Sequence, residues 1–430
     1  MANGNATMLA SRDSYLAPPS SRAEWAQGWR AVAAGSLGFG AACVHKDVLS
    51  VVMKPLQGEF GWSRTEISMA ILILVVCQLM FSPFIGQILA RFGLRKVALF
   101  GVTWYGVGLA AIGLAGPSIW SWYLGWIAFS FMYVCVSPAV WTSEVARNFS
   151  RQRGLALAVT LSLGTGILTF VVPSISVAVI AEYGWRAAFV AVGALSLLIT
   201  YPAVLLLLKP STADERRAIM DNDLPGMTRT EAMRTGRFWR LTLSLFIATG
   251  VMATLSIHLM SMLTDKGLTA TEAALGAGAI GPALLFGRLM FGLVLDRITG
   301  PALALIAFSF PLAACALLLG FQGGAMAGVV IGLLIGVAWG VESDLAAYMC
   351  SRYFGVRNYT QIFAMVHPIA AIGFGLGPVL AAVVFDLAGS YQLLLWGVLV
   401  ALLISAGLMV SLGAYTYAAD DGAAAEPDHA

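Results

Sequence analysis

The stretch from Glu66 to Ala90, which reads EISMAILILVVCQLMFSPFIGQILA, decides the fold of this chain. After Glu66 it contains no Asp, Glu, Lys or Arg until Arg91. About 20 apolar residues in a helix are enough to cross the hydrocarbon core of a bilayer. Inside that core every backbone N–H and C=O must be paired within the segment, which favours a helix. We therefore expect a membrane-spanning helix over residues 66–90.

The rest of the chain repeats this pattern. Of its 430 residues, 59% are hydrophobic and 11% are charged, against about 25% charged residues in soluble domains. This excess indicates that lipid surrounds most of the protein. We expect an all-α membrane protein with twelve transmembrane helices in two six-helix bundles. The predicted spans are about 31–53, 66–90, 96–116, 119–143, 154–181, 186–208, 241–263, 271–295, 301–321, 325–349, 358–385 and 391–414.

One connection between these stretches is longer and more charged than the others, at residues 209–240. We interpret it as a cytoplasmic linker between an N-terminal bundle over 29–208 and a C-terminal bundle over 241–414. Residues 1–28 are polar, and residues 415–430 are acidic. We expect both ends to be disordered and cytoplasmic.

Lys and Arg residues set the predicted orientation, because cytoplasmic loops carry an excess of them. With the N-terminus in the cytoplasm, 19 of the 25 Lys and Arg residues fall on the inner side. Four fall on the outer side, namely Lys54, Arg64, Arg186 and Lys266. This split agrees with an even number of helices. The short loops favour a bacterial inner membrane.

The two predicted bundles also resemble each other in sequence. Six residues between Gly61 and Arg91 recur 206 positions later, between Gly267 and Arg297. Duplication of six helices is one known transporter architecture, with the binding site near mid-membrane between the halves. Channels contain repeats too, so the repeat alone does not decide the function.

Two loop motifs carry a family resemblance. Residues 86–96, GQILARFGLRK, resemble the major facilitator superfamily loop between helices 2 and 3, and residues 292–297, GLVLDR, resemble its second copy. The resemblance implies a major facilitator fold whose motif loops latch the inner side. Ala90 stands where the family usually has an acidic residue, which weakens the ion pair expected there. The gating residues implied by the motif are Gly86, Arg91, Gly93, Arg95, Gly292, Asp296 and Arg297.

A narrower resemblance extends over nearly the whole chain. The segments 60–68 (FGWSRTEIS), 153–158 (RGLALA), 183–189 (YGWRAAF) and 351–355 (SRYFG) occur in the order typical of one branch. Together they resemble the monocarboxylate transporter and oxalate/formate antiporter branch. The resemblance implies transport of a small carboxylate and does not fix which one.

Arg288 is the first candidate for substrate binding. It lies nine residues before Arg297, so about 13 Å deep in a hydrocarbon core about 30 Å thick. An ionisable group there costs at least about 2.5–3.5 kcal/mol, and a guanidinium matches a carboxylate with two parallel hydrogen bonds. The resemblance implies a substrate arginine at this position, four residues before Gly292. Leu284 replaces the aspartate that the family often has. The alternative role for Arg288 is a buried structural ion pair.

Lys46, in the first predicted helix, is the second candidate, because the resemblance implies a coupling lysine in about this place. The neighbouring Asp47 points about 100° away, so we expect the two not to face the same spot. Tyr133 offers a hydroxyl for the same carboxylate. The alternatives are a lysine that reaches toward the outer surface and a tyrosine that only packs.

Four residues are candidates for carrying a coupled proton. Glu342 and Asp344 lie ten and eight residues before Arg352, so about 15 and 12 Å deep, where burial favours a neutral carboxyl group. His367 lies at a similar depth, and its imidazole changes charge near neutral pH. Asp47 is the fourth candidate. The alternatives are packing against inner arginines for the acids and a neutral hydrogen-bonding role for the histidine.

Other function classes find no support in the sequence. It has no phosphate-binding Gly-x-x-x-x-Gly-Lys-Ser/Thr loop, no serine elbow and no cluster of metal ligands. We therefore expect no enzyme activity, no cofactor and no metal. No basic cluster suggests nucleic-acid binding, and the five cysteines match neither a disulfide framework nor a zinc site.

The predicted function is secondary active transport of a small monocarboxylate, by alternating access, in symport with a proton. We expect the protein to work as a monomer in the bilayer. A carboxylate/carboxylate exchanger stays open as an alternative, although Glu342 argues against it. A multidrug exporter is disfavoured by Arg288. A receptor or membrane-bound enzyme is disfavoured by the absence of catalytic motifs and of a soluble domain.

Overall fold

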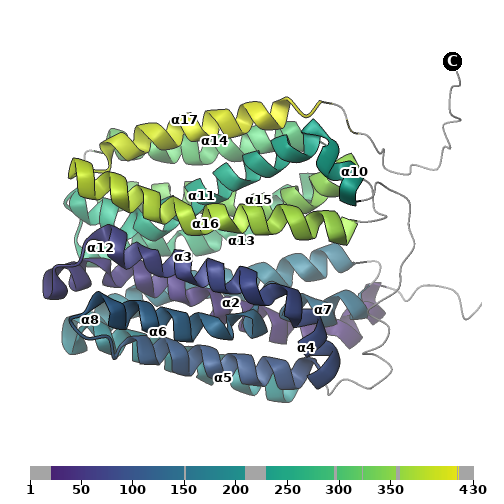
Figure 1. Ribbon diagram of the computed structural model, residues 1–430, viewed down its shortest axis with the longest axis horizontal. Coiled ribbons are helices and arrows are strands. Elements are labelled where there is room, and N and C mark those ends of the chain that lie inside the picture. The colour runs from purple at the N-terminus through teal and green to yellow at the C-terminus, as the bar shows by residue number, and fades with distance from the viewer. Residues whose placement is uncertain are drawn as a thin grey trace, which may run out of the picture.

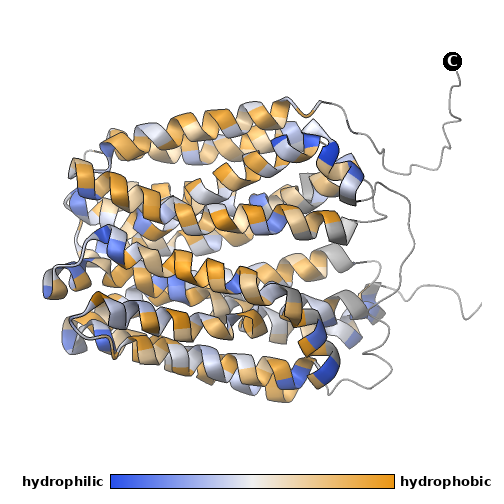
Figure 2. Ribbon diagram, in the orientation of Figure 1, coloured by the Kyte–Doolittle hydropathy of each residue, from blue (hydrophilic) through white to orange (hydrophobic). Residues whose placement is uncertain are grey.

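The computed structural model describes residues 21–149, 152–208, 229–294, 298–321, 323–354, 359–413 and 415. Within these ranges the chain forms helices and no strand. The helices run side by side along the longest axis of the molecule (Figure 1). Hydrophobic residues dominate along their length, while hydrophilic residues gather toward the two ends (Figure 2). This distribution is the one that a bundle crossing a bilayer requires.

The first half of the chain contains six membrane spans in succession. Several of them are interrupted by short turns, such as the 3-10 turn η1 (Ser82–Phe84) with Pro83 near its start. Its helices are α2 (Ser21–Phe60), α3 (Arg64–Phe81), α4 (Ile85–Phe92), α5 (Leu94–Ile112), α6 (Ile119–Phe131), the 3-10 turn η2 (Tyr133–Val136), α7 (Pro138–Asn148) and α8 (Arg153–Leu207).

The second half repeats the arrangement. A short helix, α10 (Arg229–Arg234), precedes its spans. These are α11 (Gly236–Asp265), α12 (Ala270–Gly278) with α13 (Ile280–Val294), α14 (Gly300–Leu319), α15 (Ala325–Phe354), α16 (Tyr359–Ala388) and α17 (Gln392–Val410).

The number of spans agrees with the predicted fold. In the described ranges nine helices are long and apolar enough to cross a membrane, or ten if the bent pair Ile119–Phe131 and Tyr133–Val145 is one span. α8 contributes two spans, because the chain turns back at Gly184, whose φ of 79° suits only glycine. α5, with 19 residues, is not among those nine or ten and is the helix left to complete twelve. The prediction of an all-α membrane protein with twelve spans agrees with this arrangement.

Corresponding helices of the two halves begin with the same cap. At α3 the Ser63 hydroxyl accepts from the Glu66 N–H and the Glu66 carboxylate accepts from the Ser63 N–H. Thr269 and Glu272 form the same capping box at α12. A reciprocal cap satisfies two backbone donors that a helix start would leave unpaired. The repeat seen in the sequence therefore encodes where these helices begin.

The spans α2 and α8 approach each other through glycines. A side-chain carbon added at Gly164 would lie 1.9 Å from the Ser36 carbonyl oxygen, and one added at Gly40 would lie 2.3 Å from the Gly164 backbone. Only glycine allows backbones so close, as is common at helix interfaces in membranes. This contact fixes α8 against α2. Both helices carry residues of the candidate site described below.

The two halves have separate cores and meet along four helix pairs. One core gathers around Trp122, Trp126 and Trp141, and the other around Phe238 and Tyr353. Across the boundary, α2 packs against α11, α3 against α16, and α8 against α12 and α13. α2 begins and α17 ends at one end of the molecule, which we call the termini end (Figure 1). We call the opposite end, where α3 begins and α11 ends, the distal end.

Two expected boundaries differ from the described helices. Residues 21–28, expected to be disordered, belong to α2. They are held because Trp25 donates to the Gln152 side chain at 2.7 Å and Glu24 accepts from the Gln152 N–H. The last part of the expected linker is helical, in α10 and the start of α11. The rest of that linker and most of both ends lie outside the described residues.

Candidate substrate site at the interface of the halves

Arg288 lies on α13 at the boundary between the two halves. It is buried, and its Nη1 donates to the Ser162 hydroxyl of α8 at 3.0 Å. The helix that carries it is in backbone contact with α15, since a side-chain carbon at Gly340 would lie 2.2 Å from the Leu284 carbonyl oxygen. A buried cation in a membrane helix is expensive, which makes Arg288 a candidate functional residue. Arg288 thus extends from the second half onto a helix of the first.

Lys46 lies on α2, on the other side of the same boundary. Its Nζ donates to Asp47 at 2.5 Å and to the Thr169 hydroxyl at 3.3 Å, and the Thr169 hydroxyl donates to Asp47 at 3.1 Å. The Nζ also lies 5.8 Å from the ring centre of Trp339 on α15, within reach of a cation–π interaction. The expectation that Lys46 and Asp47 face different spots is therefore wrong. Four flexible methylenes let the ammonium bend back to its neighbour.

One stripe of hydroxyl groups on α8 connects these two cations. Ser162 contacts Arg288 and Thr169 contacts Lys46. Their spacing of seven residues is two helical turns and corresponds to about 10 Å along the axis. The hydroxyl of Thr165, between them, donates to the Leu161 carbonyl. An anion lying along this stripe would meet a cation from each half.

Sequence reasoning missed Ser162, Thr169 and Trp339. A signal was present for the first two, because hydroxyl residues at positions 162, 165 and 169 of an apolar span repeat at helical spacing. Nothing in the sequence distinguished Trp339 from the other eleven tryptophans. Its place beside Lys46 depends on how the two halves pack.

The other predicted acids and the histidine lie in the second half. Glu342, half-buried on α15, accepts a hydrogen bond from the Thr249 hydroxyl of α11. Asp344 lies on the same helix, and its side chain is outside the described part of the structure. His367 on α16 is exposed, with its ring 5.6 Å from that of Phe363. Among the proton candidates whose side chains the structure describes, Asp47 is the one in direct contact with a cation.

Tyr133 is placed inside the first half. Its hydroxyl donates to the Ala42 carbonyl of α2 at 3.2 Å, and its ring lies 5.4 Å from that of His45. The described hydrogen bond therefore satisfies the hydroxyl within its own bundle. A role in substrate binding would require that bond to break.

The motif residues of the first half lie at the termini end. Gly86 and Arg91 belong to α4, and Gly93, with φ 78°, separates it from α5. Arg95 donates to the Leu205 carbonyl of α8 at 2.7 Å. In the second copy Gly292 lies in α13, but its surroundings are not described. Asp296 and Arg297 lie outside the described residues. The structure therefore shows the motif loop joining neighbouring spans of the first half.

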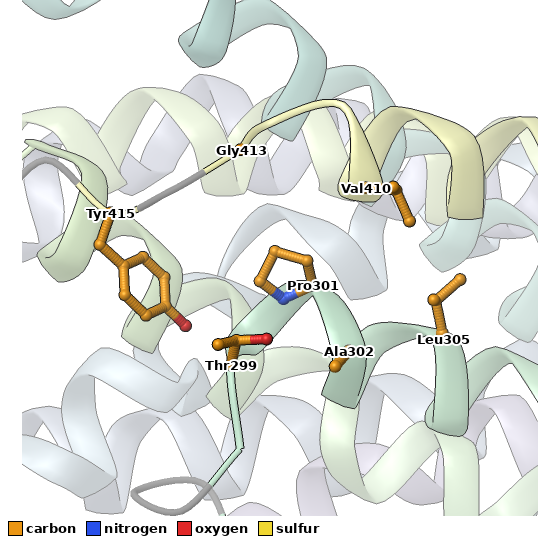
Figure 3. A pocket seen from close by; sticks show the side chains of 7 residues that line it. All are labelled: Thr299, Pro301, Ala302, Leu305, Val410, Gly413 and Tyr415. Carbon is orange, nitrogen blue, oxygen red and sulfur yellow. The ribbon is translucent and has the colours of Figure 1, made fainter.

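One cavity in the described part of the structure lies away from this cluster. It measures about 390 Å³ and is formed at the termini end between the start of α14 and the end of α17 (Figure 3). Its walls are mostly apolar and carry no charged side chain. Within the described ranges, no three His, Cys, Asp or Glu side chains lie together as metal ligands would. We therefore take the cluster at the boundary as the candidate substrate site. The residues lining the cavity are Thr299, Pro301, Ala302, Leu305, Val410, Gly413 and Tyr415.

Comparison with known proteins agrees with this architecture. Residues 35–378 match the family model described as Major Facilitator Superfamily. The chain belongs to the major facilitator superfamily. This is a family of transporters. The family resemblance expected from the sequence motifs is confirmed.

The curated relatives of this major facilitator protein are monocarboxylate transporters. It is 27% identical over 309 residues to monocarboxylate transporter 13 of Bos taurus. This alignment covers 71% of this chain and 66% of the cattle protein. It is 23% identical over 401 residues to monocarboxylate transporter 11 of Homo sapiens, covering 86% and 78%. The chain thus spans slightly under two thirds of the cattle protein.

A solved structure supports the fold of this major facilitator protein. A bacterial homolog of the human lysosomal transporter Spinster, in an inward-facing and occupied conformation, matches with a TM-score of 0.62. The match covers 89% of this chain and 96% of that chain at 16% identity.

Proposed function

We propose that this protein moves a small monocarboxylate together with a proton, by alternating access. The observation that carries the proposal is the pair of buried cations, Lys46 and Arg288, supplied by opposite halves to one hydroxyl stripe on α8. A small carboxylate placed there would pair with one cation first, and approach of the halves would bring the second cation to it. Binding then draws the halves together around the anion, which is what a carrier with a site between two moving bundles requires.

Coupling to a proton follows from the partner of Lys46. In the structure Asp47 pairs with Lys46 at 2.5 Å. A carboxylate that takes over the ammonium leaves Asp47 buried without its cation, and an unpaired buried charge is costly. Protonation of Asp47 removes that cost, so anion and proton bind together. One negative charge and one proton cross electroneutrally, so the membrane potential contributes little.

The proposed setting is a bacterial inner membrane. The distal end, with few Lys and Arg residues, faces the outside, and both chain termini face the cytoplasm. The protein acts as a monomer, since the candidate site is assembled from the two halves of a single chain.

Uptake into proteoliposomes tests this function. The panel contains labelled lactate, pyruvate, oxalate and larger aromatic acids, each with and without an inward proton gradient. The variants are Arg288→Gln and, as a matched control, Arg186→Gln, which removes an arginine from an exposed ion pair with Glu59. We expect gradient-driven uptake of a monocarboxylate in the wild type and the control, and its loss in Arg288→Gln. Uptake that occurs only against preloaded anion would favour an exchanger.

A further inference from the structure

A polar network at the distal end joins the two halves, and Arg64 is its centre. Arg64 is the first residue of α3 and is 4% exposed. Its Nη1 and Nη2 donate to the two carboxylate oxygens of Asp265, the last residue of α11, at 2.9 and 3.2 Å. A bidentate, charge-assisted pair of this kind is among the strongest polar contacts in proteins. Lys54 of α2 adds a second cation to Asp265 at 2.7 Å.

The second half holds Arg64 from two further sides. The guanidinium also donates to the Tyr391 hydroxyl at 2.6 Å, and it lies 3.7 Å from the ring centre of Phe385. Asp386 accepts from the Arg64 N–H at 3.2 Å, from the Thr65 N–H at 2.9 Å and from the Thr65 hydroxyl at 2.5 Å. A carboxylate at the start of a helix is also favoured by the helix dipole. We call Arg64, Thr65, Asp265, Asp386 and Tyr391 the distal latch.

The latch continues into the interior of the second half. His258 Nε2 contacts the Pro378 carbonyl at 2.9 Å, and its Nδ1 contacts the Tyr391 hydroxyl at 2.9 Å. A carbonyl only accepts, so Nε2 carries the hydrogen and Nδ1 accepts from Tyr391. The Tyr391 hydroxyl in turn accepts from Arg64. Each donor in this chain of contacts has its acceptor, which fixes Tyr391 in place for the arginine.

Comparison of the two repeats shows that Arg64 is not part of the helix cap. The cap residues recur 206 positions later, Ser63 as Thr269 and Glu66 as Glu272, whereas Arg64 corresponds to Ala270. The α12 cap thus forms without an arginine. Arg64 is therefore not required for the cap that begins its helix.

The same comparison shows why Asp265 takes its arginine from the other half. With the 206-residue offset, Asp265 corresponds to Glu59, which pairs with Arg186 of its own half at 2.7 Å. Gly184 and Gly389 align with an offset of 205, which places Tyr391 where Arg186 stands. The second half thus has the acid without the arginine. Arg64 replaces it from across the boundary, so an intrabundle ion pair in one repeat has become an interbundle pair in the other.

We propose that the distal latch is a gate that holds the distal ends of the halves together and must open once in every transport cycle. Gln57, which accepts from Arg64 Nε at 3.1 Å, lies eleven residues along α2 from Lys46, or about 16 Å. Separation of α3 from α11 and α16 would expose the way to the cation pair from that end. This proposal requires alternating access and does not depend on which substrate is carried.

Distance measurement between spin labels tests the gate. Labels are attached at Tyr183→Cys and Met326→Cys, which are 73% and 73% exposed near the distal ends of the two halves. The labelled protein is a variant in which the five native cysteines are replaced and transport is retained, and it is reconstituted in nanodiscs. The test variants are Arg64→Gln and Asp265→Asn. The matched control is Arg186→Gln, which breaks the repeat-equivalent ion pair inside one half.

We expect both test variants to shift the distance distribution toward longer values, and the control to keep the wild-type distribution. The gate is contradicted if neither test variant changes the distribution, or if the control lengthens it as much as they do. Thermal unfolding midpoints of all variants separate opening from loss of fold, and Asp265→Asn serves where Arg64→Gln does not fold. The measurement needs no substrate, so its failure is distinguishable from failure of the proposed transport function.

Discussion

At the scale of single residues, the contact between Lys46, Asp47 and Thr169 is the most informative feature. Three polar groups in one buried triangle satisfy one another, with Asp47 accepting from both partners. The substitution Asp47→Asn keeps the shape and removes the proton acceptor. We expect uptake that an inward proton gradient no longer accelerates, with exchange against preloaded anion retained.

The matched control for that variant is Glu342→Gln. Glu342 is another acid in an apolar helix, and its described hydrogen bond is with Thr249 rather than with a cation. Gradient-driven uptake should survive this change. If the proton gradient no longer accelerates uptake in Glu342→Gln but still does so in Asp47→Asn, Glu342 rather than Asp47 carries the proton.

Ser162 belongs to the same scale, because it positions the guanidinium of Arg288 at 3.0 Å. Removing a hydrogen bond to a charged group costs about 1.5–3 kcal/mol, and about 1.4 kcal/mol is a tenfold change in affinity. Ser162→Ala should therefore raise the KM for the anion on the order of tenfold, with little change in maximal rate. Ser196→Ala is the control, since that buried hydroxyl donates to Val192 of its own helix. An unchanged KM in Ser162→Ala would remove Ser162 from the site.

At the scale of helices, the contact of α2 with α8 sets the geometry of the first half. Gly164→Ala would place a methyl group 1.9 Å from the Ser36 carbonyl oxygen. Overpacking of this kind costs about 1–3 kcal/mol. We expect a lower midpoint in thermal unfolding of the purified protein and reduced uptake, because α8 carries the hydroxyl stripe.

Gly58→Ala is the matched control, in the partner helix α2, where an added carbon meets nothing within 4 Å. Alanine is the better helix former, so this change should leave the midpoint equal or higher. A midpoint as low in Gly58→Ala as in Gly164→Ala would mean that the close approach is not what stabilises the pair.

At the scale of the whole molecule, the sequence predicted the architecture better than the site. Long uncharged stretches and the 206-residue repeat lead directly to two bundles of six helices, because a span in lipid has few alternatives to a helix. Depth along a helix likewise singled out Arg288, and the family resemblance singled out Lys46; both are buried. These inferences need only local spacing and the cost of charge in hydrocarbon.

What the sequence did not predict depends on contacts between helices far apart in the chain. Thr169, from a different span, completes the triangle with Lys46 and Asp47, so a rule based on the angle between neighbours failed. Arg64 was counted only as an outer basic residue, because its acceptors Asp265 and Asp386 are 201 and 322 residues away. Packing of the two halves decides both.

We propose that Arg288 and Lys46 together bind a monocarboxylate that enters with a proton. The most direct measurement records the internal pH of proteoliposomes with a trapped fluorescent dye after external monocarboxylate is added. For the wild type and Arg186→Gln we predict acidification of the lumen that a membrane potential does not change, and for Arg288→Gln no acidification. Anion uptake without acidification in the wild type, or undiminished acidification in Arg288→Gln, would contradict the account.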